Sequence, residues 1–299
     1  MKTELFFQNI INGLSLGSLY ALIAVGYTMV YGILRLINFA HGDIFMLGAY
    51  FIFYFTAVLK LNVFISIVMG IVGCGIVGVM IDRIAYRPLR NAPRVSSLIT
   101  AIGVSFFIES FGTVVFSGIP KSYREVYPLF FEKILFIGKI RVNMVSVITL
   151  VSVCIIFFSV WLLVYKTRFG IAMRAVSTDI STVSLMGINV DRIIGTTFFI
   201  GSALACIGAF LWASRYPQIN PYMGFTPGIK AFTAAVLGGI GSVTGAAVGG
   251  LLLGLIEVLI VGFFPWISGF KDAFAFLILI LILSFKPAGL FGRKEIVKV

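Results

Sequence analysis

The chain has 299 residues, of which 60% are hydrophobic and only 11% are charged. Soluble globular domains carry roughly 25% charged residues, so this composition excludes a soluble enzyme, a disordered chain and a small disulfide-stapled secreted domain. The 23 Lys and Arg outnumber the 11 Asp and Glu. They stand in short clusters between apolar runs, a pattern that is typical of membrane proteins and not of nucleic-acid-binding ones.

Five segments contain no charged residue and are long enough to cross a bilayer, which takes about 20 mostly apolar residues. These segments are 5–34, 61–81, 142–165, 193–214 and 231–256. Three further apolar stretches, 44–59, 95–120 and 273–285, are shorter or interrupted. Backbone polar groups in lipid must be satisfied within their own segment. We therefore predict an all-α integral membrane protein with about 8–9 transmembrane or broken helices.

In chain order, the predicted helices run over 8–34, 42–59, 62–81, 96–117, 145–165, 193–213, 228–239, 243–261 and 271–286. Small residues recur every four positions in the first of them, at Gly13, Gly17 and Ala21. This spacing predicts close helix packing. We expect re-entrant or short segments near 38–49 and 228–242, a pairing that can mark a midplane site in transporters with internal repeats.

No shift in composition marks a domain boundary, so we expect one membrane domain over residues 1–299. A mild excess of Lys and Arg places 82–94, 166–192 and 286–299 on the cytoplasmic side. The polar stretch 118–144 then forms an external loop. Within it, β-prone residues flank Gly138 and predict a small hairpin over 134–142.

Three polar residues interrupt apolar sequence just before the second predicted helix: Asn38, His41 and Asp43. Asn38 or Asp43 is predicted to cap a helix that begins near Ile44. The free N-terminus of that helix is alternatively an anion site. For His41 we weigh a hydrogen-bonded structural role against a role as a gate.

Two carboxylates fall inside predicted spans, Glu109 and Glu257. An ionisable residue at membrane depth faces the protein interior or water and is a functional hypothesis by default. Each either lines the translocation path or is neutralised by a partner that holds helices together. The glycines Gly238, Gly239 and Gly241 either serve close packing or break the backbone where it lines a pathway.

Nothing in the sequence supports catalysis. There is one histidine, no GxxxxGK[ST] phosphate loop and no cluster with metal-ligand spacing, so we expect no enzyme, no cofactor and no metal site. The three cysteines lie in apolar runs and are expected to be small core residues. If transport by this chain is ATP-driven, a partner must supply the ATPase.

The segment 166–192 is polar and amphipathic. Ala175, Asp179, Val183, Met186 and Gly187 recur at helical spacing. A short amphipathic helix that leaves the membrane either lies on the bilayer surface or docks a partner, and composition alone favours neither.

Four stretches together indicate a family. They are 17–32 (GSLYALIAVGYTMVYG), 35–43 (RLINFAHGD) with 48–50 (GAY), 174–189, and 232–242 (FTAAVLGGIGS) with 245–246. The whole chain resembles the inner-membrane permease subunits of bacterial ATP-binding-cassette importers for branched-chain amino acids, of the smaller Liv type. The combination of Asn-Phe-Ala-His-Gly with Leu-Gly-Gly-Ile-Gly-Ser in one chain is specific to it.

The resemblance implies a multi-pass protein of the cell inner membrane that forms the pathway for leucine, isoleucine and valine. An external binding protein would deliver the amino acid, a second, similar permease would complete the pathway, and two cytoplasmic ATPase subunits would drive it. Residues 174–189 would be the coupling helix, ended by Gly187. The residues implied in coupling are Arg174, Ala175, Asp179, Leu185, Gly187 and Asn189.

The sequence departs from many relatives at Thr178-Asp179 and at Val183, which affects the details of the contact with the ATPase. Other members serve urea, short amides or other amino acids, and these stay open as alternative substrates. A stand-alone secondary transporter or channel is a further alternative. The choice between a homodimeric and a heterodimeric permease also stays open.

Overall fold

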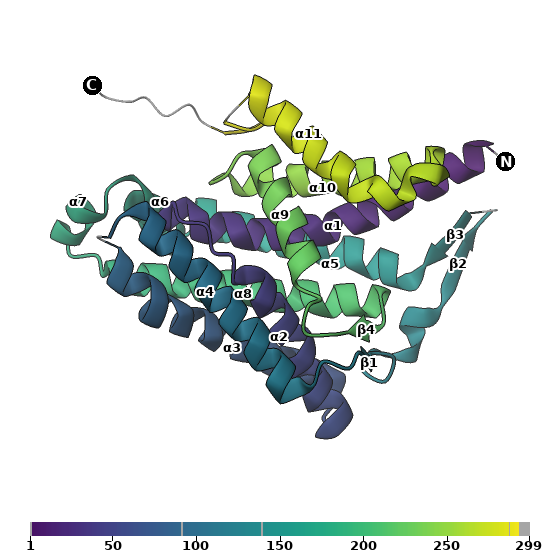
Figure 1. Ribbon diagram of the computed structural model, residues 1–299, viewed down its shortest axis with the longest axis horizontal. Coiled ribbons are helices and arrows are strands. Elements are labelled where there is room, and N and C mark those ends of the chain that lie inside the picture. The colour runs from purple at the N-terminus through teal and green to yellow at the C-terminus, as the bar shows by residue number, and fades with distance from the viewer. Residues whose placement is uncertain (1, 91, 139, 287, 293–299) are drawn as a thin grey trace.

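The computed structural model describes residues 2–90, 92–138, 140–286 and 288–292, and it is almost entirely helical (Figure 1). Within these residues, 7 helices are long and apolar enough to cross a membrane, or 8 if the bent pair Pro265–Phe274 and Phe276–Phe285 counts as one span. The expected all-α integral membrane protein is confirmed.

The elements follow the apolar pattern closely. The helices are α1 (Lys2–Leu34), α2 (His41–Phe53), α3 (Val63–Ile81), α4 (Arg94–Phe116), α5 (Met144–Lys166), α6 (Arg168–Thr178), α7 (Ile180–Leu185), α8 (Val190–Arg215), α9 (Phe225–Gly238), α10 (Val243–Phe263) and α11 (Lys271–Phe285). The short helical turns are η1 (Tyr54–Val58), η2 (Asp82–Tyr86), η3 (Arg87–Leu89), η4 (Leu129–Glu132) and η5 (Pro265–Phe270). The strands are β1 (Lys121–Ser122), β2 (Ile134–Ile137), β3 (Ile140–Asn143) and β4 (Gln218–Ile219).

Helix α1 is the central element and packs along α10 through small residues (Figure 1). A Cβ added at Gly17 would lie 2.8 Å from the Cα of Leu251, and one added at Gly13 would lie 3.0 Å from the Cα of Leu255. The backbones therefore approach as closely as they do only because these positions lack side chains. The small-residue spacing in α1 correctly predicts this contact.

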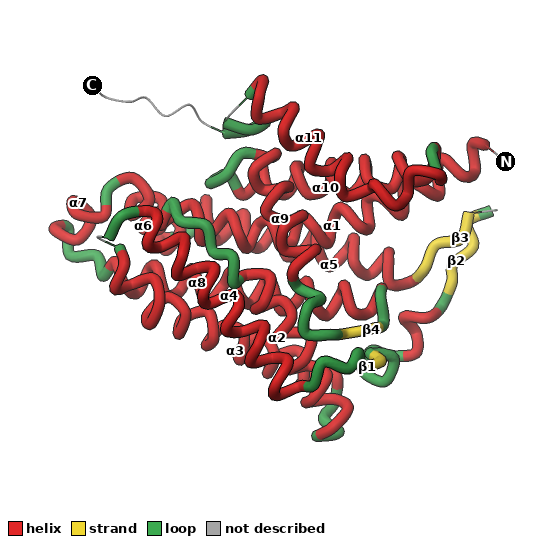
Figure 2. Tube along the Cα trace, viewed as in Figure 1, coloured by secondary structure: helices red, strands yellow, loops and turns green. Residues whose placement is uncertain are grey.

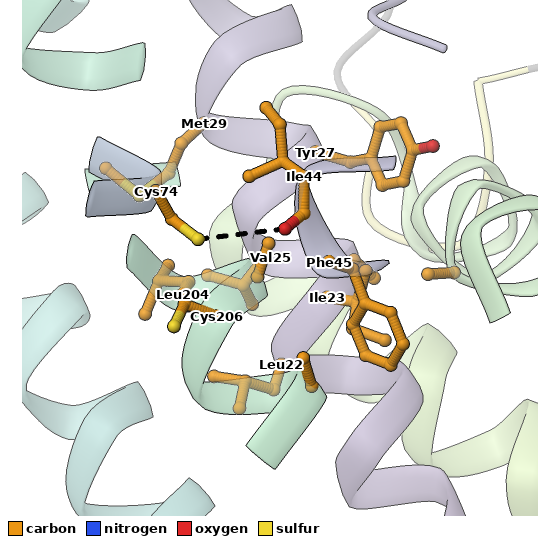
Figure 3. Close-up of a cluster of buried hydrophobic side chains, with 14 of the residues drawn as sticks. Leu22, Ile23, Val25, Tyr27, Met29, Ile44, Phe45, Cys74, Leu204 and Cys206 are labelled. Atoms are coloured by element: carbon orange, nitrogen blue, oxygen red, sulfur yellow. Dashed lines mark hydrogen bonds between the residues drawn. The ribbon is translucent and has the colours of Figure 1, made fainter. Parts of the chain in front are cut away.

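The apolar core lies where α1, α2, α3 and α8 cross (Figure 3). Ile23 of α1, Ile44 of α2 and Cys206 of α8 are fully buried there. The Sγ of Cys74 on α3 lies 3.8 Å from the carbonyl oxygen of Ile44. Cys74 and Cys206 are small core residues as expected, but Cys154 is exposed on α5, because α5 turns most of its apolar surface outward.

The segment α6–α7 and the hairpin β2–β3 lie at opposite ends of the molecule (Figure 2). In the hairpin Leu135 pairs with Val142, and Gly138 has a φ of 63° at the turn, so the predicted hairpin is confirmed. A second short ladder, β1–β4, pairs Lys121 with Ile219.

Helix α5 joins the hairpin to α6. At 1.5 Å per residue, its 23 residues span roughly 34 Å, enough to cross a hydrocarbon core of about 30 Å.

Two details of the predicted helices are wrong. The chain is irregular only before His41, and α2 with η1 then continues to Val58, so 38–49 is not a separate short element. Residues 174–189 do not form one helix, because Asp179 adopts an extended conformation and separates α6 from α7. The other expected short segment is confirmed: α9 has only 14 residues and ends at Gly238.

Candidate functional site

An ionic cluster lies buried between four helices. The Nζ of Lys230 on α9 lies 2.8 Å from Oε1 of Glu257 on α10 and 2.6 Å from Oδ1 of Asp272 on α11. The hydroxyl of Tyr20 on α1 donates to Oε2 of Glu257 at 3.0 Å. Lys230 and Glu257 are almost fully buried, while Asp272 is half exposed. Glu257 is therefore a paired carboxylate, as one of the two sequence hypotheses held.

Lys230 is a residue that the sequence analysis missed. It stands alone, immediately before the uncharged run 231–256. A lone ammonium group within a buried short helix requires an opposite charge, and from the sequence this requirement was the available signal. With Lys230 in place, the cluster ties α9 to α1, α10 and α11.

Neither Asn38 nor Asp43 caps α2. Ala40 precedes the first turn of α2, and no side chain accepts a cap hydrogen bond there. Asn38 instead accepts a hydrogen bond from the Tyr86 hydroxyl at 3.1 Å, and Asp43 accepts one from the Ser105 hydroxyl at 2.5 Å. The predicted capping role is wrong, because both side chains bond to neighbouring helices.

His41 is buried and packs against Tyr27, with ring centroids 4.4 Å apart. Its Nε2 has no hydrogen-bond partner in the described part of the chain. Glu109 lies one turn along α4 from Ser105 and is half-buried. Asp43, Ser105 and Glu109 thus gather at the crossing of α2 and α4, whereas Glu257 lies in the separate cluster on α10.

The glycine-rich turn after α9 reverses the chain into α10. Gly239 and Gly241 have φ values of 107° and 90°, which favour glycine. Gly238 accepts a hydrogen bond from the backbone N–H of Phe291 at 2.9 Å, so the segment 288–292 packs onto the turn. Ser242 then caps α10 by accepting from the N–H of Gly245.

A cavity of about 950 Å³ opens beside this turn. Gly241 and Ser242 of the turn, Arg35 at the end of α1 and Arg174 of α6 all lie in its wall. A much smaller pocket of about 10 Å³, lined by Asn38 among others, adjoins it through the shared residues Tyr31 and Ile240. The irregular turn therefore borders open space, the setting in which irregular backbone is tolerated at membrane depth.

The segment α6–α7 ends in an apolar tip that is exposed on the surface of the protein. Leu185 is 88% exposed and Met186 is 74% exposed at the end of α7. Asp179 caps α7 by accepting from the backbone N–H groups of Ser181 and Thr182 at 2.9 and 3.2 Å. The hydroxyls of the same two residues also donate to Asp179 and lower its pKa to about 2.

The remaining residues implied in coupling make local contacts at both ends of this segment. Arg174 donates to the carbonyl oxygen of Val164 at 3.0 Å and lies over the ring of Tyr165, so it fixes the elbow between α5 and α6. Ala175 is half-buried beside it. Gly187 has a φ of 79° just after α7, and Asn189 caps α8 by accepting from the N–H of Arg192.

Seven or more helices that are long and apolar enough to span a membrane, with a cavity beside the α9–α10 turn and a protruding amphipathic segment, are typical of a multi-pass membrane permease. No group of three or more His, Cys, Asp and Glu that could hold a metal occurs among the described residues.

Comparison with known proteins agrees with that class. The family described as "Branched-chain amino acid transport system / permease component" matches residues 9–283. The chain is 41% identical to the high-affinity branched-chain amino acid transport system permease protein LivH of Salmonella typhimurium, over 98% of both chains. It is also 41% identical to BraD of Pseudomonas aeruginosa, again over 98% of both. No solved structure matches the chain.

The chain therefore belongs to the family of branched-chain amino acid transport system permease components. It is a multi-pass inner-membrane protein, and its relatives are transport permeases. The resemblance found in the sequence is confirmed.

Proposed function

We propose that this protein is the permease subunit of an ATP-binding-cassette importer and forms the translocation pathway for leucine, isoleucine and valine. The observation that carries the proposal is the 41% identity to LivH and BraD, which extends over 98% of the chain. Identity over this length includes every spanning helix together with the segments outside them. An external binding protein delivers the amino acid, and two ATPase subunits supply the energy.

The ATPase docks on α6–α7. Exposed apolar side chains at Leu185 and Met186 suit insertion into a groove of a partner protein. The buried face of α6, which includes Met173 and Val176, anchors the segment to the membrane helices. A displacement of Leu185 and Met186 by the ATPase is therefore passed on through α6 to the membrane helices.

A second, homologous permease completes the pathway. Helices α3 and α4 have largely exposed apolar faces, which lipid and a partner permease would share. The cavity beside Gly241 and Arg174 belongs to the cytoplasmic half of the pathway on this proposal. Its wall includes α6 residues, so ATPase docking would act directly on it.

The cytoplasmic ATPase subunits dock on α6–α7, and this fixes the orientation of the chain in the membrane. The segments 82–94 and 166–192 face the cytoplasm, and 118–144 is the external loop. The whole chain is one permease domain. The opposite placement of the hairpin and α6–α7, joined by the single long helix α5, supports this arrangement.

Uptake by the reconstituted transporter tests the proposal. The permease is combined in proteoliposomes with its partner permease, the ATPase subunits and the binding protein, and [3H]leucine accumulation is measured with ATP inside or outside. We expect ATP-dependent uptake that isoleucine and valine compete with and that urea and acetamide leave unchanged. Competition by urea or acetamide alone would assign the chain to the amide-transporting members. Uptake without the ATPase subunits would favour a stand-alone transporter.

A further inference from the structure

The arginine-rich segment after α3 does more than mark the cytoplasmic side. Sequence analysis treats 82–94 as a topological signal. In the structure, η2 and η3 fold into a compact elbow, which we define as residues 82–90. This elbow contacts α3, α4 and α8. Its ion pairs join it to the start of α8, and its hydrogen bonds join it to the segment before α2.

On one side the elbow is bound to the beginning of α8. Arg87 Nη2 lies 2.5 Å from Oδ2 of Asp191, and Arg90 Nη1 lies 2.6 Å from Oδ1 of the same residue. Both carboxylate oxygens of Asp191 are thus held by different arginines. Asp191 is the second residue of α8 and follows the α6–α7 tip by only a few positions. Asp191 is thus close in the chain to that tip and is ion-paired to the elbow.

Within the elbow, Arg90 also binds Asp82, with Nη2 at 2.9 Å from Oδ1. The Asp82 side chain is 2% exposed, so it requires a cation, and Arg90 supplies it. Asp191 is different, because its side chain is 46% exposed and water would solvate it without the arginines. The contacts of Asp191 are therefore not needed to neutralise a buried charge, and their effect is to join α8 to the elbow.

On the other side the elbow is bound to the irregular segment before α2. Tyr86 is buried and packs on Phe198 of α8, with ring centroids 5.5 Å apart. Its hydroxyl donates to Oδ1 of Asn38 at 3.1 Å, and the carbonyl oxygen of Ile37 lies at 3.4 Å. Ile37 and Asn38 line the small pocket that adjoins the cavity. The elbow therefore contacts both the wall of this pocket and the start of α8, next to α6–α7.

We propose that the elbow 82–90 is a transmission element that carries displacement of α6–α7 through Asp191 and Arg90 to Tyr86, and from Tyr86 to Asn38 in the segment before α2. This rests on the proposed ATP-driven function. Asp191 and Tyr86 are positioning residues, since neither needs to touch the transported amino acid. The alternative is that both contacts only stabilise the fold, each independently.

The test compares Asp191→Asn, Tyr86→Phe and the double variant in the complete reconstituted transporter. Each single change removes one link without changing side-chain volume appreciably. Arg192→Gln and Arg83→Gln are matched controls, because these exposed arginines take no part in the ion pairs of the elbow. Asp191→Glu keeps the charge and serves as the rescue. ATP hydrolysis and [3H]leucine uptake are measured on the same vesicles.

We expect both single variants to lower leucine taken up per ATP hydrolysed by about tenfold, within the roughly 2- to 30-fold range over which such changes modulate coupling. ATP hydrolysis should stay within about twofold of the unaltered protein. Because the two links act in series, the double variant should be no worse than the poorer single one. The controls and Asp191→Glu should keep normal coupling.

Two results would overturn the proposal. One is a coupling ratio that stays normal in Asp191→Asn and Tyr86→Phe. The other is a double variant whose losses multiply, since independent contributions combine in that way. If the unaltered transporter shows no ATP-dependent uptake, the proposed function fails, and this outcome is distinct from failure of the transmission element alone.

Discussion

The Nζ of Lys230 lies 2.8 Å from Oε1 of Glu257, and both side chains are almost fully buried between α9 and α10. Helix α9 is too short to span the membrane alone. The ion pair therefore fixes this helix against the longer ones. A buried pair of this kind makes the two charges mutually dependent, because either one left alone is costly.

Removing one partner of this pair should destabilise the protein strongly. We expect Lys230→Met and Glu257→Gln each to lower the free energy of unfolding, the former by about 3–5 kcal/mol because it leaves a buried carboxylate without its close cation. The double variant Lys230→Met/Glu257→Met should recover much of the loss. The measurement is SDS titration of the purified protein followed by tryptophan fluorescence.

Lys271→Met is the matched control for the ion pair. Its Nζ lies 3.8 Å from Glu257 and its side chain is 48% exposed, so its loss should cost less than about 1 kcal/mol. Equal effects of Lys230→Met and Lys271→Met would show that the buried pair has no special role.

The contact between α1 and α10 should tolerate no added methyl group. A Cβ at Gly17 would lie 2.7 Å from the carbonyl oxygen of Leu251, whereas one at Gly103 on α4 would meet nothing within 4 Å. Gly17→Ala should therefore destabilise by about 1–3 kcal/mol through overpacking. Gly103→Ala should be neutral or slightly stabilising, since Ala favours helices. SDS titration gives the stability of both variants. Equal stabilities would contradict the close packing of α1 on α10.

The cap at Asp179 should matter for uptake but not for its pH dependence. Hydrogen bonds from Ser181 and Thr182 lower the pKa of Asp179 to about 2. A carboxyl whose folded pKa is lowered contributes its stabilisation above its ordinary pKa and loses it only as pH falls toward about 2. Titration of Asp179 should therefore add no pH dependence to leucine uptake between about pH 5 and pH 8.

Substitution separates the cap from the charge at this position. Asn is as good a cap as Asp, whereas Ala provides none. We expect Asp179→Asn to retain uptake and Asp179→Ala to lower it about fivefold. If Asp179→Asn were as impaired as Asp179→Ala, the negative charge itself would contact the partner, and the capping explanation would be wrong.

Reporter fusions test the orientation. Fusions after residues 88 and 180 should report a cytoplasmic location, and a fusion after residue 130 should report an external one, because α5 separates the hairpin from α6. Paired alkaline phosphatase and green fluorescent protein fusions give opposite signals on the two sides. Residues 130 and 180 on the same side would rule out the arrangement.

Hydropathy alone predicts most of the fold, because each spanning helix must satisfy its own backbone within an apolar run. The small-residue pattern at Gly13 and Gly17 also predicts a packing contact correctly. Neither the hydropathy nor the small-residue spacing predicts which polar side chains contact each other. The oxygens of Asn38 and Asp43 accept hydrogen bonds from Tyr86 and Ser105, and these partnerships depend on how distant helices cross.

The break at Asp179 shows a similar limit. The spacing of apolar residues over 174–189 is compatible with one helix, and only local competition decides otherwise. Asp179 bonds the N–H groups of Ser181 and Thr182, and short polar side chains favour such caps over helix interiors. The sequence position of Lys230 indicates that it needs a partner of opposite charge, but not that this partner is Glu257, 27 positions away.

Site-specific cross-linking from the tip of α7 tests the central claim most directly. Leu185→Cys and Phe136→Cys are introduced singly into a Cys154→Ser background, which removes the exposed native thiol. Both positions are well exposed, one on α7 and one on the hairpin at the opposite end. The assembled transporter is then treated with a bifunctional thiol-to-amine reagent. We predict an adduct with the ATPase subunit from position 185 and none from position 136. An ATPase adduct from 136 but not from 185 would contradict the account.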